Sequence, residues 1–133
     1  MKYLLDVNVL VAWGWADHED HLRAAKWIAA EIASSANHIL TSPIPELGFV
    51  RVSVQRGRGL VTPEQASTTL ETMVRVLGPI YEFLPDDESA RAWPPWCQGA
   101  ARTTDAHLLA LAGSHQVELA TLDTGIPGAY LIP

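Results

Sequence analysis

Lys2-Tyr3-Leu4-Leu5-Asp6, at the start of the chain, is a short apolar run that ends at an acid. It predicts a buried strand over residues 2–5, and the residues after it, 7–13, predict a first helix. Similar short runs recur further along, at residues 38–40, 80–84, 118–121 and 129–132. Longer segments with helical spacing separate them. Strands that alternate with helices predict an α/β fold with a mostly parallel sheet.

The longer segments carry the start and stop signals of helices. Residues 21–33 place apolar side chains three and four apart, among them Leu22, Ile28 and Ala29, which predicts an amphipathic helix with these residues on its buried face. Thr62-Pro63-Glu64 is a helix start, with a capping Thr, an early Pro and an acid, for a helix that runs to Leu77.

Three further segments have weaker helical signals. One helix is expected to carry Glu46 and to end near Arg56-Gly57. Another is expected to start with Thr103 or Thr104 as its cap and to run through His115. A single helical turn is expected between Pro85 and Pro95.

Length and composition indicate one globular domain over residues 1–133. The chain has 133 residues, of which 48% are hydrophobic, and it contains no repeat or long linker. The one cysteine, Cys97, excludes an internal disulfide and a Cys-based zinc site. No segment has the length and apolar character of a signal peptide or a membrane helix, so a cytoplasmic location is expected.

The formal net charge of −6 argues against a protein that coats nucleic acid non-specifically. Part of this charge comes from acids that are candidates for metal ligands. Without the four acids Asp6, Glu46, Asp105 and Asp123 the formal charge is −2. Divalent cations bound there would make the site attractive to phosphate.

These four acids are expected to share one edge of the sheet. Asp6 and Asp123 directly follow strands, Glu46 follows the second strand after a short turn, and Asp105 opens a helix. Each acid alone has an ordinary structural explanation, such as a helix cap or a turn residue. In an open parallel sheet, however, strand carboxyl ends and the helix starts that follow them line one edge, where ligands bind. The pattern therefore predicts a single cleft with four carboxylates.

Clustered carboxylates indicate a site for a hard divalent cation. They repel one another unless cations or protons are present, and Mg²⁺ and Mn²⁺ prefer oxygen ligands. Such a site suits phosphodiester hydrolysis, because the ion lowers the pKa of water and stabilises charge on phosphate oxygens. No Ser/His/Asp arrangement or glycine-rich phosphate loop offers a competing chemistry.

Four segments together resemble the PIN-domain ribonucleases, and in particular the VapC toxins of bacterial toxin–antitoxin pairs. They are Leu5–Leu10, Pro45–Arg51, Thr103–Ala110 and Ala120–Asp123. They occur in the family's order and with similar spacing over essentially the whole chain, and the ordered set is more specific than any one motif. The resemblance implies a three-layer PIN-like fold for a single PIN domain over residues 1–133.

The resemblance also implies a function and a set of site residues. Asp6, Glu46, Asp105 and Asp123 match the family's acidic positions. Asn8 matches a position that orients the first acid, and Thr121 matches a hydroxyl beside the metal site. The implied activity is hydrolysis of RNA, commonly tRNA or rRNA, with Mg²⁺ or Mn²⁺. The implied partners are a cognate VapB-type antitoxin and a second copy of the chain in a homodimer, with no membrane partner.

Several alternatives stay open from the residues alone. A small Mg²⁺-dependent phosphatase could use Asp6 as its nucleophile, and a non-catalytic binding module could hold a structural cation. The cluster Arg51, Arg56 and Arg58 is either a solvated helix end or a phosphate-binding patch, and Arg102 is a weaker candidate for the same role. The segment Trp93-Pro94-Pro95-Trp96 matches no family motif and has no assigned role.

Overall fold

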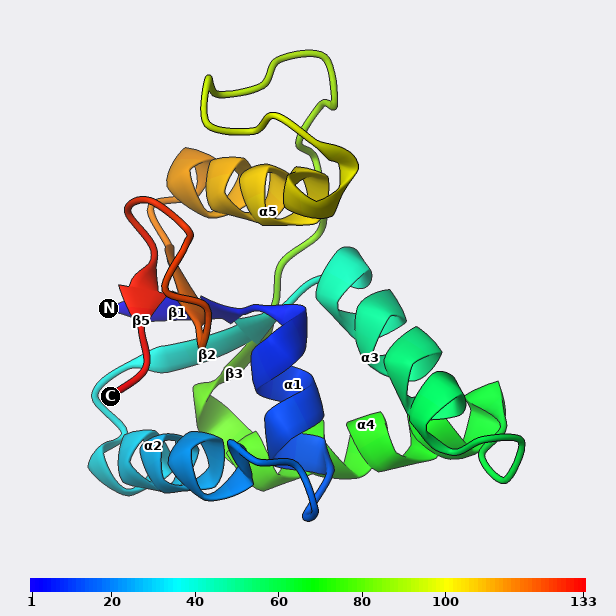
Figure 1. Ribbon diagram of the computed structural model, residues 1–133. Helices are drawn as coiled ribbons and strands as arrows, with labels where there is room; N and C mark the ends of the chain where they lie inside the picture. The colour runs from blue at the N-terminus through cyan, green and yellow to red at the C-terminus, as the bar shows by residue number, and fades with distance from the viewer.

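The computed structural model describes all 133 residues and contains one parallel sheet. Its five strands lie in the order β3-β2-β1-β4-β5 (Figure 1). Their bounds are β1 Lys2–Leu5, β2 His38–Thr41, β3 Tyr81–Phe83, β4 Glu118–Thr121 and β5 Tyr130–Leu131. The predicted α/β class and each predicted strand are confirmed, and every strand pairing is parallel.

Helices cover both faces of the sheet. Their bounds are α1 Val7–Gly14, α2 His21–Ser34, α3 Pro43–Arg56, α4 Pro63–Leu77 and α5 Thr103–Ser114, with short 3₁₀ turns at Gly78–Ile80 and Ala100–Arg102. Figure 1 shows α5 across one face of the sheet, while α1, α2 and α4 lie on the opposite side with α3 beside them. No helix combines the length and the apolar character that crossing a membrane requires.

The buried strands divide their side chains between two hydrophobic clusters. Tyr3 and Leu5 join the cluster under α1, α2, α3 and α4, whereas Leu4 points to the cluster under α5. Ile39 and Leu40 of β2 divide in the same way. This follows from the two-residue side-chain period of a strand, and it explains why β1 is apolar at consecutive positions: both of its faces are covered.

The topology brings the ends of β1 and β4 together. The chain first moves outward from β1 to β2 and β3, then returns to the other side of β1 with β4 and β5. The strand order therefore reverses between β1 and β4, and in open parallel sheets ligands bind at this point, outside the carboxyl ends of the strands. Leu5 pairs with Ala120, so Asp6 and Thr121 follow side by side.

The predicted helix start at Thr62 is confirmed in detail. The Thr62 hydroxyl accepts a hydrogen bond from the Gln65 N–H at 3.1 Å, and the Gln65 side chain accepts one from the Thr62 N–H at 3.0 Å. This reciprocal capping box satisfies two of the N–H groups that every helix start leaves without a partner.

Three local predictions were wrong. Residues 85–95 contain no helical turn and form part of a long loop between β3 and α5. Thr103 and Thr104 lie inside α5, whose cap is Arg102, and neither caps the helix. Leu22 is 81% exposed and Ala29 is also exposed, because α2 buries Ala24, Trp27 and Ile28.

The two leucines Leu4 and Leu22 offer a matched test of this fold. Leu4 is fully buried between the sheet and α5, so Leu4→Ala is expected to lower the free energy of unfolding by about 2–5 kcal/mol. Leu22→Ala removes an exposed side chain and is expected to change it by less than about 0.5 kcal/mol. Urea denaturation of both variants measures the difference, and equal losses would contradict this arrangement of the core.

Candidate active site

Asp6 is a buried carboxylate at the carboxyl end of β1. It is 4% exposed, and its backbone N–H extends the β1–β4 ladder by donating to the Ala120 carbonyl at 3.0 Å. Its Oδ1 accepts a hydrogen bond from the Val7 N–H at 2.7 Å, so the side chain also caps α1. Its Oδ2 accepts one from the Thr121 hydroxyl at 2.8 Å. The carboxylate is therefore held from both sides.

Asn8 acts on Asp6 through Thr121. The Asn8 Nδ2 donates to Thr121 Oγ1 at 3.2 Å, and Asn8 Oδ1 accepts from the Leu122 N–H at 3.2 Å. Thr121 Oγ1 also accepts from the Asp123 N–H at 3.1 Å. The Thr121 hydroxyl thus links the segments that follow β1 and β4, and it donates its own hydrogen bond to Asp6.

Asp105 and Asp123 approach Asp6 from two other elements. Asp105 lies in the first turn of α5, and Asp123 lies in the turn after β4, where its Oδ1 accepts from the Gly125 N–H at 2.7 Å. The pKa values record their proximity. Burial, with smaller contributions from the charges of Asp105 and Asp123, raises the pKa of Asp6 to about 6 against the hydrogen bonds from Thr121 and Val7.

The pKa of Asp105 is also raised above its usual range. Burial is the main cause, the Asp123 charge adds to it, and the Arg102 guanidinium opposes it. Three carboxylates at the switch point of the sheet thus repel one another.

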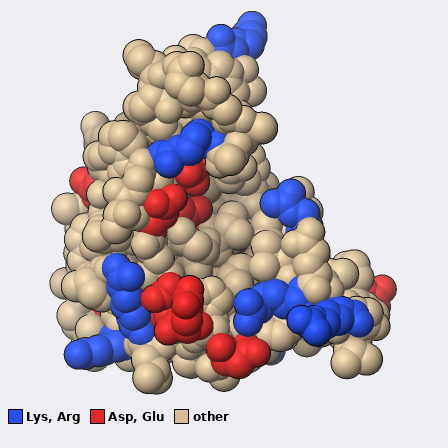
Figure 2. Space-filling model, in the orientation of Figure 1, with Lys and Arg blue, Asp and Glu red and all other residues tan.

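A cavity of about 360 Å³ opens beside these acids. Its polar lining comes from Asp6, Asn8, His18, Arg51, Thr104 and Asp105. In Figure 2, acidic side chains gather in a hollow below α5, with basic side chains at its margins. Two of the lining residues, His18 and Thr104, had no functional role in the sequence interpretation. The available signal is the position of Thr104 directly before Asp105, where the sequence predicts only a helix cap.

Glu46 lies at the same edge of the sheet but outside this cavity. It is in the first turn of α3, and its Oε2 accepts a hydrogen bond from the Thr41 hydroxyl at 2.6 Å. The Thr41 hydroxyl also lies 2.7 Å from the Tyr81 hydroxyl. The structure therefore brings together Asp6, Asp105 and Asp123, and places Glu46 beside the end of β2.

The four arginines have different surroundings. Arg51 is exposed and lines the cavity. Arg56 pairs with Asp17 at 3.1 Å and lies over the ring of Trp15, and Arg58 is exposed in the turn after α3. Arg102 lies between α5 and the turn after β4, where its guanidinium is bound within the protein.

The donor set fits a hard divalent cation. As the side chains lie, no three His, Cys, Asp or Glu residues are arranged to hold one ion together. A magnesium ion, however, is usually held by one or two carboxylates with water and substrate oxygens completing its shell. Asp6, Asp105 and Asp123 supply oxygen ligands only, and a cation would relieve the repulsion that raises the pKa values of Asp6 and Asp105.

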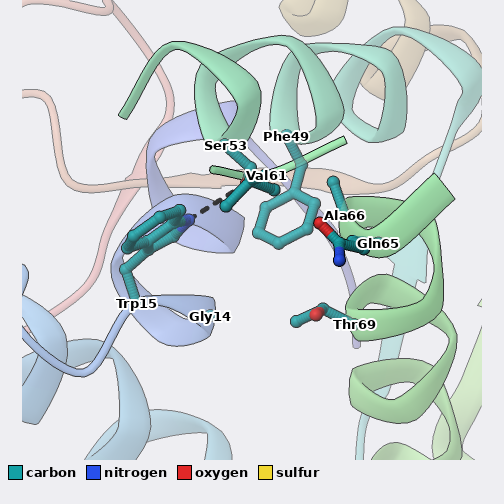
Figure 3. A pocket seen from close by; sticks show the side chains of 8 residues that line it. All are labelled: Gly14, Trp15, Phe49, Ser53, Val61, Gln65, Ala66 and Thr69. Carbon is teal, nitrogen blue, oxygen red and sulfur yellow. Dashed lines mark hydrogen bonds between the residues drawn. The ribbon is translucent and has the colours of Figure 1, made fainter. Parts of the chain in front are cut away.

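A second hollow lies on another part of the surface (Figure 3). It is lined by Gly14, Trp15, Phe49, Ser53, Val61, Gln65, Ala66 and Thr69, and the Trp15 indole N–H donates to the Ser53 hydroxyl at 3.0 Å. No acid or base lines it, so it does not offer hydrolytic chemistry.

The burial of Asp6 predicts a pH dependence of stability in EDTA. Because the folded-state pKa is about 6 and the ordinary value is 3.8, the folded state holds the proton more tightly. The protonated Asp6 therefore stabilises the folded state fully below pH 3.8, and this stabilisation is lost as the pH rises through 6. The free energy of unfolding falls by about 3 kcal/mol over this range. Asp6→Asn removes this titration, so the variant is expected to gain stability relative to the wild type between pH 4 and pH 8. Thermal melting across this range measures it, and parallel pH profiles would refute the assignment.

Comparison with known proteins agrees with this architecture. The family model of the PIN domain matches residues 3–130. Ribonuclease VapC39 of Mycobacterium tuberculosis is 37% identical over 95% of this chain and 91% of that protein. Ribonuclease VapC38 of the same organism is 37% identical over 92% of this chain and 86% of that protein.

A solved structure has the same fold. It is VapBC2 from Rickettsia felis bound to a DNA fragment from its promoter, with a TM-score of 0.61 and 16% identity, covering 98% of this chain and 97% of the other. With the family model spanning nearly the whole sequence and the relatives aligned over almost their full lengths, this chain belongs to the PIN-domain family.

Proposed function

We propose that this protein is a metal-dependent endoribonuclease toxin that hydrolyses RNA phosphodiester bonds, with tRNA or rRNA as its target. One observation carries the proposal: Asp6, Asp105 and Asp123 lie close together where the strand order of the sheet reverses. The cavity beside them is also lined by Arg51. The relatives named as VapC ribonucleases support this function.

The three aspartates are proposed to hold Mg²⁺ or Mn²⁺. When bound, such an ion activates water and neutralises the charge that develops on phosphate oxygens. Thr121 and Asn8 keep the Asp6 carboxylate at one position, which limits the reorganisation that binding requires. Glu46 is proposed as the fourth acid of the site, acting from the adjacent carboxyl end of β2.

The substrate backbone is proposed to follow α3. Arg51 lines the cavity, and Arg56 and Arg58 continue the positive charge at the end of this helix, where Figure 2 shows a basic surface. The planar guanidinium group matches phosphate oxygens with two parallel hydrogen bonds.

A cognate VapB-type antitoxin is the proposed partner that keeps the enzyme silent. The solved relative is a VapBC assembly, which supports this part of the proposal. A homodimer stays a prediction from the family resemblance, and a cytoplasmic location stays a prediction from the sequence composition.

Asp6→Asn and Asp105→Asn are expected to lower RNA cleavage by about 100-fold or more, the scale of losing one electrostatic stabiliser of the transition state. Antitoxin-free protein is incubated with total cellular RNA in Mg²⁺, Mn²⁺ or EDTA, and the new RNA ends are mapped. The control is Glu71→Gln, which changes an exposed acid paired with Arg75 on α4 and is expected to leave cleavage unchanged.

Discrete cuts that require both metal and Asp6 would establish the function and identify the target. A folded protein that binds the metal but cuts no RNA would disprove it. Turnover of a phosphomonoester through a phosphorylated Asp6 would instead reassign the chain to the phosphatases.

Arg51→Ala is expected to weaken RNA binding without affecting the metal. Its control is Arg75→Ala, which removes an exposed arginine paired with Glu71 on α4. Anisotropy of a labelled single-stranded oligoribonucleotide in EDTA gives the affinity at several salt concentrations. Loss of one phosphate contact is expected to make the slope of log K against log salt shallower by about 0.7. An unchanged affinity and slope would exclude Arg51 from the RNA path.

A further inference from the structure

Residues 84–99 form a strap over α5 that is anchored near its start, at residues 86–88, and near its end, at Trp96. This strap leaves the end of β3 and passes over the outer side of α5 (Figure 1). Its three consecutive acids bind side chains of α5 and of the residue directly after it: Asp86 to His107 at 2.6 Å, Glu88 to Ser114 at 2.9 Å, and Asp87 to His115 at 2.8 Å. The strap is therefore fixed to the helix that carries Asp105.

Near the end of the strap, Trp96 contacts an arginine. Trp96 packs against the hydrophobic cluster under α5, and the Arg102 guanidinium lies over its ring at 5.1 Å. A guanidinium stacked on an indole loses much of its freedom, which fixes the direction of its N–H groups. The segment Trp93-Pro94-Pro95-Trp96, to which the sequence assigned no role, thus orients Arg102.

Arg102 contacts two parts of the acidic site at once. Its Nη2 donates to the Gly125 carbonyl, and its Nε lies 3.8 Å from Asp105 Oδ2. The Gly125 N–H in turn donates to Asp123 Oδ1 at 2.7 Å. A side chain at position 125 would crowd this contact, because its Cβ would lie 3.0 Å from Arg102 Nη1 and 3.2 Å from Asp123 Oδ1.

We propose that Arg102 is a positioning residue that sets the separation of Asp105 and Asp123 in the metal site, and that Trp96 holds it in place for this task. Arg102 reaches Asp105 directly and Asp123 through the turn at Gly125. This inference rests on the proposed metal site and replaces the RNA-contact role that the sequence interpretation gave to Arg102. The guanidinium stacks on Trp96, donates to the Gly125 carbonyl and forms an ion pair with Asp105, while its Nε has no hydrogen-bond partner.

The direction in which the Mn²⁺ affinity changes distinguishes a positioning role of Arg102 from a purely electrostatic effect of its charge. Removing a positive charge beside a cation site tightens cation binding by electrostatics alone. Losing a residue that orients metal ligands weakens it, by about 10-fold or more. Arg102→Met is therefore expected to weaken Mn²⁺ binding in spite of the lost positive charge. Gly125→Ala keeps the charge and displaces the guanidinium, so it is expected to weaken binding as well.

Calorimetric titration of the full chain with Mn²⁺ measures both variants, and thermal melting in EDTA verifies that they are folded. The matched controls are Arg91→Met, an exposed arginine of the strap, and Gly113→Ala, where an added Cβ meets no atom within 4 Å. Both are expected to bind Mn²⁺ like the wild type. Binding of a labelled oligoribonucleotide in EDTA is expected to be unchanged by Arg102→Met.

Two results would overturn the positioning role alone. In the first, Arg102→Met binds Mn²⁺ as tightly as the wild type or more tightly. In the second, Arg102→Met loses RNA binding while its Mn²⁺ binding stays the same. A folded wild type that binds no Mn²⁺ would overturn the proposed metal site, and the positioning role with it.

Discussion

The hydrogen bond from the Thr121 hydroxyl to the Asp6 carboxylate is the interaction on which the site depends. It joins the ends of β1 and β4, two strands that are neighbours in the sheet and far apart in the chain. A buried carboxylate without such partners would be very unfavourable, and here it receives hydrogen bonds from Thr121 and Val7. Its pKa is nevertheless raised, so burial and the neighbouring aspartates outweigh both bonds. The carboxylates of the site therefore repel one another, and a bound cation would relieve this repulsion.

The sequence predicted the sheet and its acidic edge because these depend on local patterns. Each strand is a short apolar run, and Asp6 and Asp123 each follow such a run within two residues. Local patterns did not predict which side of α2 is buried. Alanines lie on several sides of that helix, so apolar spacing did not distinguish the buried side of Trp27 from the exposed side of Leu22.

Other features depend on contacts between distant residues. The segment after Pro85 follows α5 without forming a helix, since its acids bind His107, Ser114 and His115. Glu46 binds Thr41 and stays beside β2, and only the folded arrangement of β2, β3 and α3 reveals this. Arg102 was a weaker candidate for phosphate binding, because it lies beside the Asp105 motif. Its partner Gly125 lies 23 residues away, where no local pattern indicates it.

The two layers of helices do not contribute equally to the site. Asp6 and Asp123 extend from the sheet, whereas Asp105 belongs to α5, which covers its face of the sheet without a second helix beside it (Figure 1). Proteins open in parts, and each part has its own opening free energy. An opening that lifted α5 from the sheet would expose the cluster around Leu4 and would separate Asp105 from the other acids. The acidic site is thus assembled across the two hydrophobic clusters of the fold, so its geometry depends on the packing of both faces of the sheet.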